Sequence, residues 1–289
     1  MIKYDSKIWF PYIFSMGRSD TIRKLFPFLL ICGFYSFLIV YFELHIFRLS
    51  QGNFLNNLTV MHSILGFVIS LLLSFRVNSA YDRWWEGRKL LGSLVNMSRN
   101  LSSKIKTHIP DPEVHRFYNI LIPEFAFSLM KHLRDEKSEL EFDIEGAVHL
   151  NDIEGHRPNH VALAMFQRLQ HLYRDGVISG EQLIVIDNEM SEFADICGAC
   201  ERIKNTPIPY SYSSFIKKFI FTYVITLPFD WAFSLGYVTI PLVMFVMYVM
   251  ASMELIAEEV ENPFGTDPND LPFEAICQGI KKHVGEILS

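Results

Sequence analysis

The sequence predicts an all-α membrane protein with four transmembrane helices and a helical domain outside the membrane. Long charge-free apolar stretches predict the spans, and a helical spacing of apolar residues between them predicts the domain. Half of the 289 residues are hydrophobic and 20% are charged. Mean hydropathy is +0.19, which is high for a soluble enzyme and modest for spans alone. Apolar and polar residues do not alternate over any stretch of useful length, as they would in half-buried strands.

Two spans are predicted in the first quarter of the chain. A helix that crosses the ~30 Å hydrocarbon core needs about 20 mostly apolar residues. Residues 25–42 carry no charge and follow three basic residues, and residues 54–75 are also free of charge and end at Arg76. Each stretch is therefore expected to cross the membrane once.

The last long apolar stretch predicts two more spans. Residues 219–253 contain one charge, Asp230, and at ~1.5 Å per residue they are far too long for one crossing. Pro228 and Gly236 offer a turn near the middle. We expect spans at about Ser213–Phe229 and Ala232–Met253, with Asp230 reaching the interface or capping a helix end.

The basic residues predict the orientation of these spans. Lys and Arg gather before the first span, after the second and at the start of the third, whereas the two opposite loops hold only Arg48. Positive charge favours the cytoplasmic side. Both termini and the segment between the two pairs of spans are therefore expected in the cytoplasm, and the start of the chain has no long apolar signal-peptide core.

The long segment between the second and third spans reads as helical. A helix face recurs at a spacing of 3 and 4 over Ala162, Met165, Phe166, Leu169, Leu172 and Tyr173. A break at 175–180 follows. Ser179 and Gln182 then have the spacing of a capping box, with Ile178 and Leu183 placed for a hydrophobic staple. Another helix is expected within 114–136, although Pro123 should kink or divide it.

The second span carries two rows of similar side chains, one aliphatic and one of small residues, and each forms a stripe along the helix. Helical rotation of ~100° per residue places the aliphatic Val60, Ile64, Val68 and Leu71 on one side. The small residues Ser63, Gly66, Ser70 and Ser74 lie about 110° away and suit close helix packing. The aliphatic stripe could face lipid, or it could form a pore wall that gates ions by dewetting.

Other motifs favour ordinary structural roles. The CGAC motif at Cys197–Cys200 lies on an apolar helix face, so core packing is favoured over a zinc site. His156 and His160 flank Pro158 in an expected surface loop, where a metal site is disfavoured. The acidic stretch after the fourth span could hold a hard cation, but a solvated loop is favoured. A nucleic-acid binder is disfavoured by the net charge of −6, and no catalytic motif indicates an enzyme.

Three segments resemble the bestrophins, and more closely their prokaryotic branch. They are FRVNSAYDRWWEGR at 75–88, CERIKNTPIPYSY at 200–212 and AEEVENPFG at 257–265. The resemblance implies a homopentameric ion channel whose second span lines a hydrophobic neck. Anchored on Arg76, the neck positions are Val60, Ile64 and Val68; an alternative register would bring in Phe67 and Ser63. A second, cytoplasmic narrowing is expected at Ile178.

The resemblance also bears on metals and on the conducted ion. Animal relatives hold calcium around NPFG and a nearly continuous acidic run, which Pro268 and Asn269 interrupt here. Asn262, Asp267 and Asp270 remain possible ligands, but no cofactor is expected to be required and calcium gating is not expected. The family implies chloride conduction, whereas the prokaryotic branch and the negative net charge lean towards cations such as sodium.

The sequence thus predicts a passive channel for small monovalent ions. The two alternative functions are a secondary transporter and a non-conducting membrane scaffold. Its expected partners are copies of itself, membrane lipid and inorganic ions, and its expected place is the bacterial inner membrane. The chain is expected to divide into five parts. They are a cytoplasmic N-terminal segment (1–24), spans one and two (25–83), a helical cytoplasmic domain (84–212), spans three and four (213–253) and a C-terminal segment that packs on the cytoplasmic domain (254–289).

Overall fold

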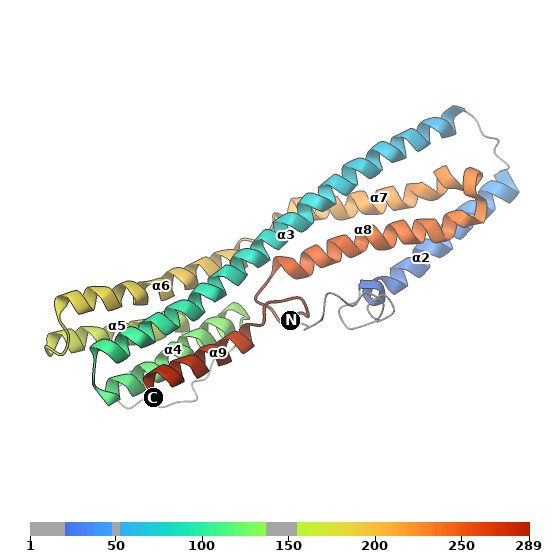
Figure 1. Ribbon diagram of the computed structural model, residues 1–289. Coiled ribbons are helices and arrows are strands. Elements are labelled where there is room, and N and C mark those ends of the chain that lie inside the picture. The colour runs from blue at the N-terminus through green and yellow to red at the C-terminus, as the bar shows by residue number, and fades with distance from the viewer. Residues whose placement is uncertain (1–20, 48–52, 137–154) are drawn as a thin grey trace. The chain divides into compact units, whose positions relative to one another are not determined.

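The computed structural model describes residues 21–47, 53–136 and 155–289 (Figure 1). Every regular element in these ranges is a helix, and no strand occurs there. The chain forms two compact units. The first comprises the chain up to Arg83, Ile208–Glu261 and Asp267–Asn269, and the second comprises Trp84–Pro207, Asn262–Thr266 and Asp270–Ser289.

The first unit is a bundle of apolar helices. Its elements are α2 (Thr21–Tyr41), a π-helical turn (Phe42–Phe47), the first part of α3 (Asn53–His108), α7 (Tyr210–Leu235) and α8 (Thr239–Glu261). Helix α2 packs on α8 and α7, and α7 packs on α8. The buried side chains of the core are all aliphatic, and partly buried aromatic and methionine side chains pack against them. The buried members are Ile69, Leu73, Ile216, Ile220, Val224, Leu227 and Val243.

The turn between α7 and α8 forms at Gly236, one of the two positions expected from the sequence. Gly236 has φ of 55°, a left-handed conformation that costs glycine little because it has no Cβ. Pro228 instead stays inside α7. Helix α7 therefore continues to Leu235, past the predicted end at Phe229. Helix α8 begins at Thr239, later than the predicted Ala232, and ends at Glu261, beyond the predicted Met253.

The apolar stretches make this an integral membrane protein. Three stretches of the described residues are long and apolar enough to cross a membrane, namely Thr21–Ile46, Thr59–His108 and Gly180–Glu261. The third range includes both α7 and α8. Helix α3 also runs without a break past the expected end of the second span, as far as His108.

The second unit is also all helical in the part that the structure describes. It holds the second part of α3, α4 (Pro112–Leu133), α5 (Arg157–Arg174), α6 (Gly180–Asn205) and α9 (Phe273–Leu288). Helix α4 packs against α5 and α9, and α5 packs against α6. Large side chains such as Phe125, Phe193 and Phe273 are fully buried in its core.

Local expectations for this unit are mostly confirmed. The capping box forms, since Gln182 N donates to Ser179 Oγ at 3.3 Å and Ser179 N donates to Gln182 Oε1 at 2.8 Å. Cys197 and Cys200 are buried in the core. Pro123, however, does not divide α4, since tertiary packing, here of α4 on α5 and α9, can override a local helix-breaking preference.

The expected loop around His156 and His160 is wrong. His156 is the N-cap of α5 and His160 lies within the helix, with Pro158 in its first turn. Proline suits this place because the first helical N–H groups have no intrahelical partner. The GHRPNH sequence is thus a helix start.

Candidate functional site

The part of α3 in the first unit has one buried and one exposed side. Ile69, Leu73, Arg76 and Ala80 are buried, at the 3- and 4-residue spacing of one helix face. Ile69 and Leu73 pack in the apolar core formed mainly by α7 side chains. This packing determines which side of α3 is left uncovered.

The expected neck residues all lie on the uncovered side. Val60 is 60% exposed, Ile64 59% and Val68 38%. Phe67 of the alternative register is 71% exposed, and Ser63 is exposed as well. Side chains of this size on an exposed helix face are available to line a passage, to contact another subunit or to face lipid.

The small-residue stripe packs closely at one of its positions. A Cβ on Gly66 would lie 2.7 Å from the hydroxyl of Tyr223 on α7, so glycine permits that approach. Ser63 and Ser70 are exposed, and their hydroxyls donate to carbonyls of their own helix, Thr59 O at 2.9 Å and Gly66 O at 2.7 Å. The stripe as a whole is therefore not a helix–helix contact within this subunit.

Ile178, the expected cytoplasmic narrowing, is 3% exposed and belongs to the core of the second unit. It precedes the capping box of α6, and Leu183 packs against the same core, as the staple interpretation requires. A side chain buried in its own subunit has little surface with which to line a passage. Ile184, six residues further along the chain and within α6, is 63% exposed.

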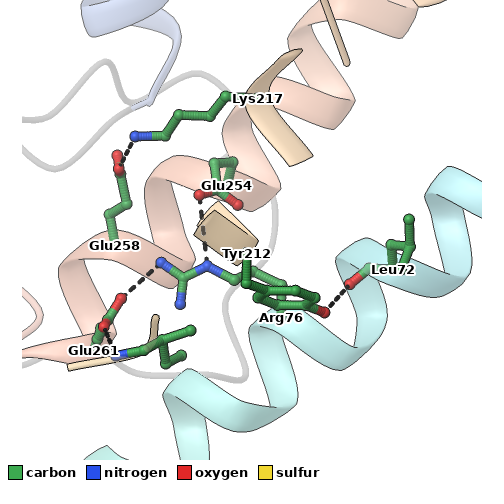
Figure 2. Close-up of polar contacts among 8 residues, drawn as sticks. Leu72, Arg76, Tyr212, Lys217, Glu254, Glu258 and Glu261 are labelled. Atoms are coloured by element: carbon green, nitrogen blue, oxygen red, sulfur yellow. Dashed lines mark hydrogen bonds and ion pairs between the residues drawn. The ribbon is translucent and has the colours of Figure 1, made fainter. Parts of the chain in front are cut away.

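Arg76 is the centre of a buried charged cluster in the first unit (Figure 2). Its Nη2 donates to Glu261 Oε2 at 2.7 Å, and its Nε lies 3.5 Å from Glu254 Oε1. Only 1% of the arginine side chain is exposed. A buried charge needs such partners because removing it from water is unfavourable.

Glu261 accepts further hydrogen bonds. Its Oε1 accepts from the Ile208 backbone N at 2.7 Å, and its carbonyl accepts from Arg83 Nε at 3.1 Å. Tyr212, four residues after Ile208, donates from its hydroxyl to Leu72 O at 3.3 Å (Figure 2). The start of α7 and the end of α8 are thus both held to α3.

The acidic stretch after the fourth predicted span is helical and paired over residues 254–261, where its interpretation as a solvated loop is wrong, whereas residues 262–270 contain no helix. Glu254, Glu258, Glu259 and Glu261 all lie in α8. Lys217 pairs with Glu258, and Lys24 pairs with Glu259. The amide of Asn269 also donates to Glu259 at 2.7 Å. Each of these four glutamates therefore has a basic partner in the first unit, with Glu254 and Glu261 sharing Arg76.

Asp230 is buried inside the first unit, contrary to the expectation that it reaches the interface. Thr59 Oγ1 donates to Asp230 Oδ1 at 2.5 Å, and His62 Nδ1 lies 3.7 Å from Asp230 Oδ2. The other ring nitrogen of His62 contacts Thr226 Oγ1 at 2.9 Å. These polar contacts join α3 to α7 and allow the acid to sit among apolar helices.

The three candidate calcium ligands differ in their surroundings. Asn262 and Asp267 are exposed, whereas Asp270 is buried. An ideal Cβ on Gly265 would lie 2.7 Å from Asp270 Oδ2 and 3.7 Å from the amide nitrogen of Asn262. Gly265 thus leaves room for the Asp270 carboxylate. Among the described His, Cys, Asp and Glu residues, Asp267 and Asp270 belong to no group with metal-ligand spacing.

Comparison with known proteins identifies the family. The sequence profile described as "Bacterial/Fungal Bestrophin protein" matches residues 1–286. This chain belongs to the bestrophin family. The match covers nearly the whole chain, so both units of this bestrophin are included.

Curated relatives of this bestrophin carry channel names. It is 34% identical over 293 residues to the voltage-dependent anion channel-forming protein alr2987 of Nostoc sp., covering 98% of this chain and 92% of the relative. It is 34% identical over 229 residues to the voltage-dependent anion channel-forming protein YneE of Escherichia coli, covering 76% and 73%. A solved bacterial bestrophin homolog from Klebsiella pneumoniae superposes with a TM-score of 0.83 at 25% identity, covering 92% and 99%.

The three segments that carried the resemblance meet at one carboxylate in this bestrophin. Arg76 comes from the first, Ile208 from the second and Glu261 from the third, and both Arg76 and Ile208 donate to the side chain of Glu261. Sequence reasoning used Arg76 to mark the end of the second span and to anchor the neck register, and it missed this contact. No local pattern reveals a pairing between residues 185 positions apart.

Proposed function

We propose that this bestrophin forms a passive ion channel in which five subunits surround one pore and α3 of each subunit lines it. The observation that carries the proposal is the uncovered apolar side of α3 around Val60, Ile64 and Val68. The opposite side of α3 is buried and packs on α7 through Ile69 and Leu73. A helix oriented in this way has an apolar face free to meet the same face of other subunits around an axis. The names of the curated relatives support channel function.

The gate of this channel is a ring of aliphatic side chains. A narrow apolar ring resists wetting, so it blocks ions without a charged filter until it widens. Val60, Ile64 and Val68 recur every four residues on one helix, which would stack three such rings along the pore. Phe67 belongs to the alternative register on the same exposed side.

For the second narrowing, Ile184 is a better candidate than Ile178. Ile184 is an exposed aliphatic side chain at the start of α6, whereas Ile178 is buried in the core of its own unit. Replacing each by alanine separates the two. If Ile184→Ala raises flux and Ile178→Ala only lowers thermal stability, the narrowing lies at Ile184.

We propose that the conducted ions are small monovalent anions. The relatives are named as forming anion channels, and the expectation of cation preference rested in part on the net charge of −6. Four of the acids behind that charge, at the end of α8, are paired with Arg76, Lys217 and Lys24. The three neighbouring basic groups reduce the local negative field of these four acids, so the acids attract cations less than isolated carboxylates would.

The proposed location is the bacterial inner membrane with both termini in the cytoplasm. The support is the distribution of Lys and Arg next to the apolar stretches. Calcium is not proposed as a requirement, since Asn262, Asp267 and Asp270 are unlike one another in burial. Addition of calcium chloride or of a chelator should therefore leave the open probability unchanged.

The deciding experiment is the reversal potential of the purified protein in planar bilayers under a potassium chloride gradient. A reversal potential near the chloride equilibrium potential supports the anion channel, and one near the potassium equilibrium potential replaces it with a cation channel. Flux that saturates and depends strictly on a second ion would indicate a secondary transporter. Absence of current at every voltage would indicate a scaffold.

A further inference from the structure

Two histidines and one glutamate from three helices of the second unit meet at a single point. His132 lies in the last turn of α4, His156 caps the start of α5, and Glu201 lies near the end of α6. His132 Nε2 is 2.6 Å from Glu201 Oε1, and His156 Nε2 contacts the same oxygen. One ligand atom of each residue lies within 4.8 Å of the other two.

The cluster is held by packing and remains open to water. The two imidazole rings have centroids 4.3 Å apart. The three side chains are between 26% and 34% exposed. An ion could therefore enter from solvent and keep a water molecule as an additional ligand.

The donor set suits zinc. Neutral imidazole nitrogen and carboxylate oxygen are ordinary zinc ligands, and two histidines with one glutamate plus water form a known four-coordinate arrangement. Zinc–ligand bonds of about 2.0–2.1 Å at tetrahedral angles separate ligand atoms by roughly 3.3 Å. The contact of 2.6 Å between His132 and Glu201 would open by about 0.7 Å as an ion replaces the shared proton.

The hydrogen bonding of His156 would change when zinc binds. Its Nδ1 accepts from Asn159 N at 3.3 Å to cap α5, so in the neutral ring the proton is on Nε2. Zinc at Nε2 would need the other tautomer and the loss of that long cap bond.

The charges and thiols near the cluster show which ligand atoms it offers to a metal ion. Lys204, three residues after Glu201, is paired with Asp135 at 2.6 Å, which offsets its repulsion of a cation. Burial raises the pKa of Cys197 and Cys200 to about 12, and neither thiol belongs to the cluster. The ligand set is therefore nitrogen and oxygen, without thiolate.

We propose that His132, His156 and Glu201 form a zinc-binding site that joins α4, α5 and α6. The proposal does not rest on conduction, because all three ligands belong to the second unit. Bound zinc would tie the start of α5 to two neighbouring helices and stabilise this unit.

The test is zinc binding by the full chain, purified in detergent without a histidine tag and stripped with a chelator. Isothermal titration with zinc chloride should show one saturable site per subunit and a raised melting temperature. His132→Ala and Glu201→Gln should weaken binding by more than the roughly 10–100-fold that loss of an outer-shell partner brings. His171→Asn, at an exposed histidine of α5, should bind zinc as the unaltered chain does.

Cobalt provides a second readout that does not depend on stability. Cobalt chloride should give the visible absorption of a four-coordinate site without a thiolate charge-transfer band, and Glu201→Gln, which keeps the side-chain volume, should lose that absorption. A thiolate band would place the metal on the cysteines and overturn the proposal. Absence of saturable zinc binding, or equal zinc affinity in the unaltered chain and in both ligand variants, would also overturn it.

Discussion

Arg76 Nη2 of α3 donates a 2.7 Å hydrogen bond to Glu261 Oε2 at the end of α8, and the arginine side chain is almost completely buried. The same glutamate accepts from the backbone of Ile208, just before α7. One carboxylate thus joins the helix proposed to line the pore to both helices of the second apolar pair. Loss of this carboxylate would leave the guanidinium with only the longer Glu254 contact.

Glu261→Gln should destabilise the protein strongly. Removing one partner of a buried ion pair typically costs about 3–5 kcal/mol, because the other charge remains buried. Glu258→Gln is the matched control, since Glu258 and Lys217 are both exposed and such pairs contribute about 0–1 kcal/mol. Thermal unfolding in detergent measures both. Equal melting temperatures for the two variants would show that Arg76 finds another partner.

Gly66→Ala should disturb the contact between α3 and α7. The added Cβ would lie 2.7 Å from the Tyr223 hydroxyl, and overpacking of this kind costs about 1–3 kcal/mol. Combining it with Tyr223→Phe removes the clashing oxygen, so the double variant should recover much of the lost stability. Gly279→Ala in α9, where a Cβ meets nothing within 4 Å, should be neutral or gain up to about 1 kcal/mol. A double variant as unstable as Gly66→Ala alone would locate the strain elsewhere.

Ile64→Ala should raise ion flux through the proposed neck. The smaller side chain widens the apolar ring and makes it easier to wet. The measurement is chloride efflux from liposomes at equal protein content. Ile31→Ala on α2, also an exposed isoleucine in the first unit, should leave flux unchanged. If both variants conduct as the unaltered channel does, Ile64 does not line the neck.

Ser179→Ala should weaken the start of α6. The hydroxyl of Ser179 accepts from Gln182 N, and loss of such a cap costs about 1 kcal/mol. Ser213→Ala is a suitable control because Ser213 lies early in α7 and is not its N-cap. Thermal unfolding near neutral pH should show a lower melting temperature for Ser179→Ala alone.

The same serine predicts a pH dependence. The Ser179 hydroxyl donates to Glu181 Oε2 at 2.7 Å and holds the pKa of Glu181 below its ordinary value of 4.5. A lowered folded-state pKa contributes stability that is present above pH 4.5 and is lost as the pH falls through the lowered value. The stability difference between the unaltered chain and Ser179→Ala should therefore shrink in acid. A difference that is constant down to the lowest measurable pH would exclude this contribution.

Features that depend on neighbouring residues were predictable from the sequence. The break before α6, its capping box and the apolar stretches of α2, α7 and α8 involve positions within one or a few turns. The turn at Gly236 was one of two proposed positions, and glycine prevailed because only it adopts a left-handed φ without strain. Pro123 was predicted to kink or divide α4, and the helix is not divided; the local effect of the proline was weighed without the packing on α5 and α9.

Burial and charge pairing could not be predicted in the same way. Asp230 was expected to reach the membrane interface or to cap a helix end, and it lies buried within α7 against Thr59 and His62. His156 was compared with His160, four residues away, whereas its partners are His132 and Glu201 on other helices. Each misjudged side chain has its decisive neighbour far along the chain.

The sequence by itself determined the helical class, the apolar stretches, the helix caps and the family, because spacing, cap chemistry and motif order are all written in consecutive residues. Only the tertiary structure decided that Arg76 and Glu261 share a buried contact, that one side of α3 is left uncovered, and that His132, His156 and Glu201 converge. The physical reason is that a charge or a polar group is stabilised by whatever lies within a few ångströms, and in a helical bundle those neighbours come from distant turns of other helices.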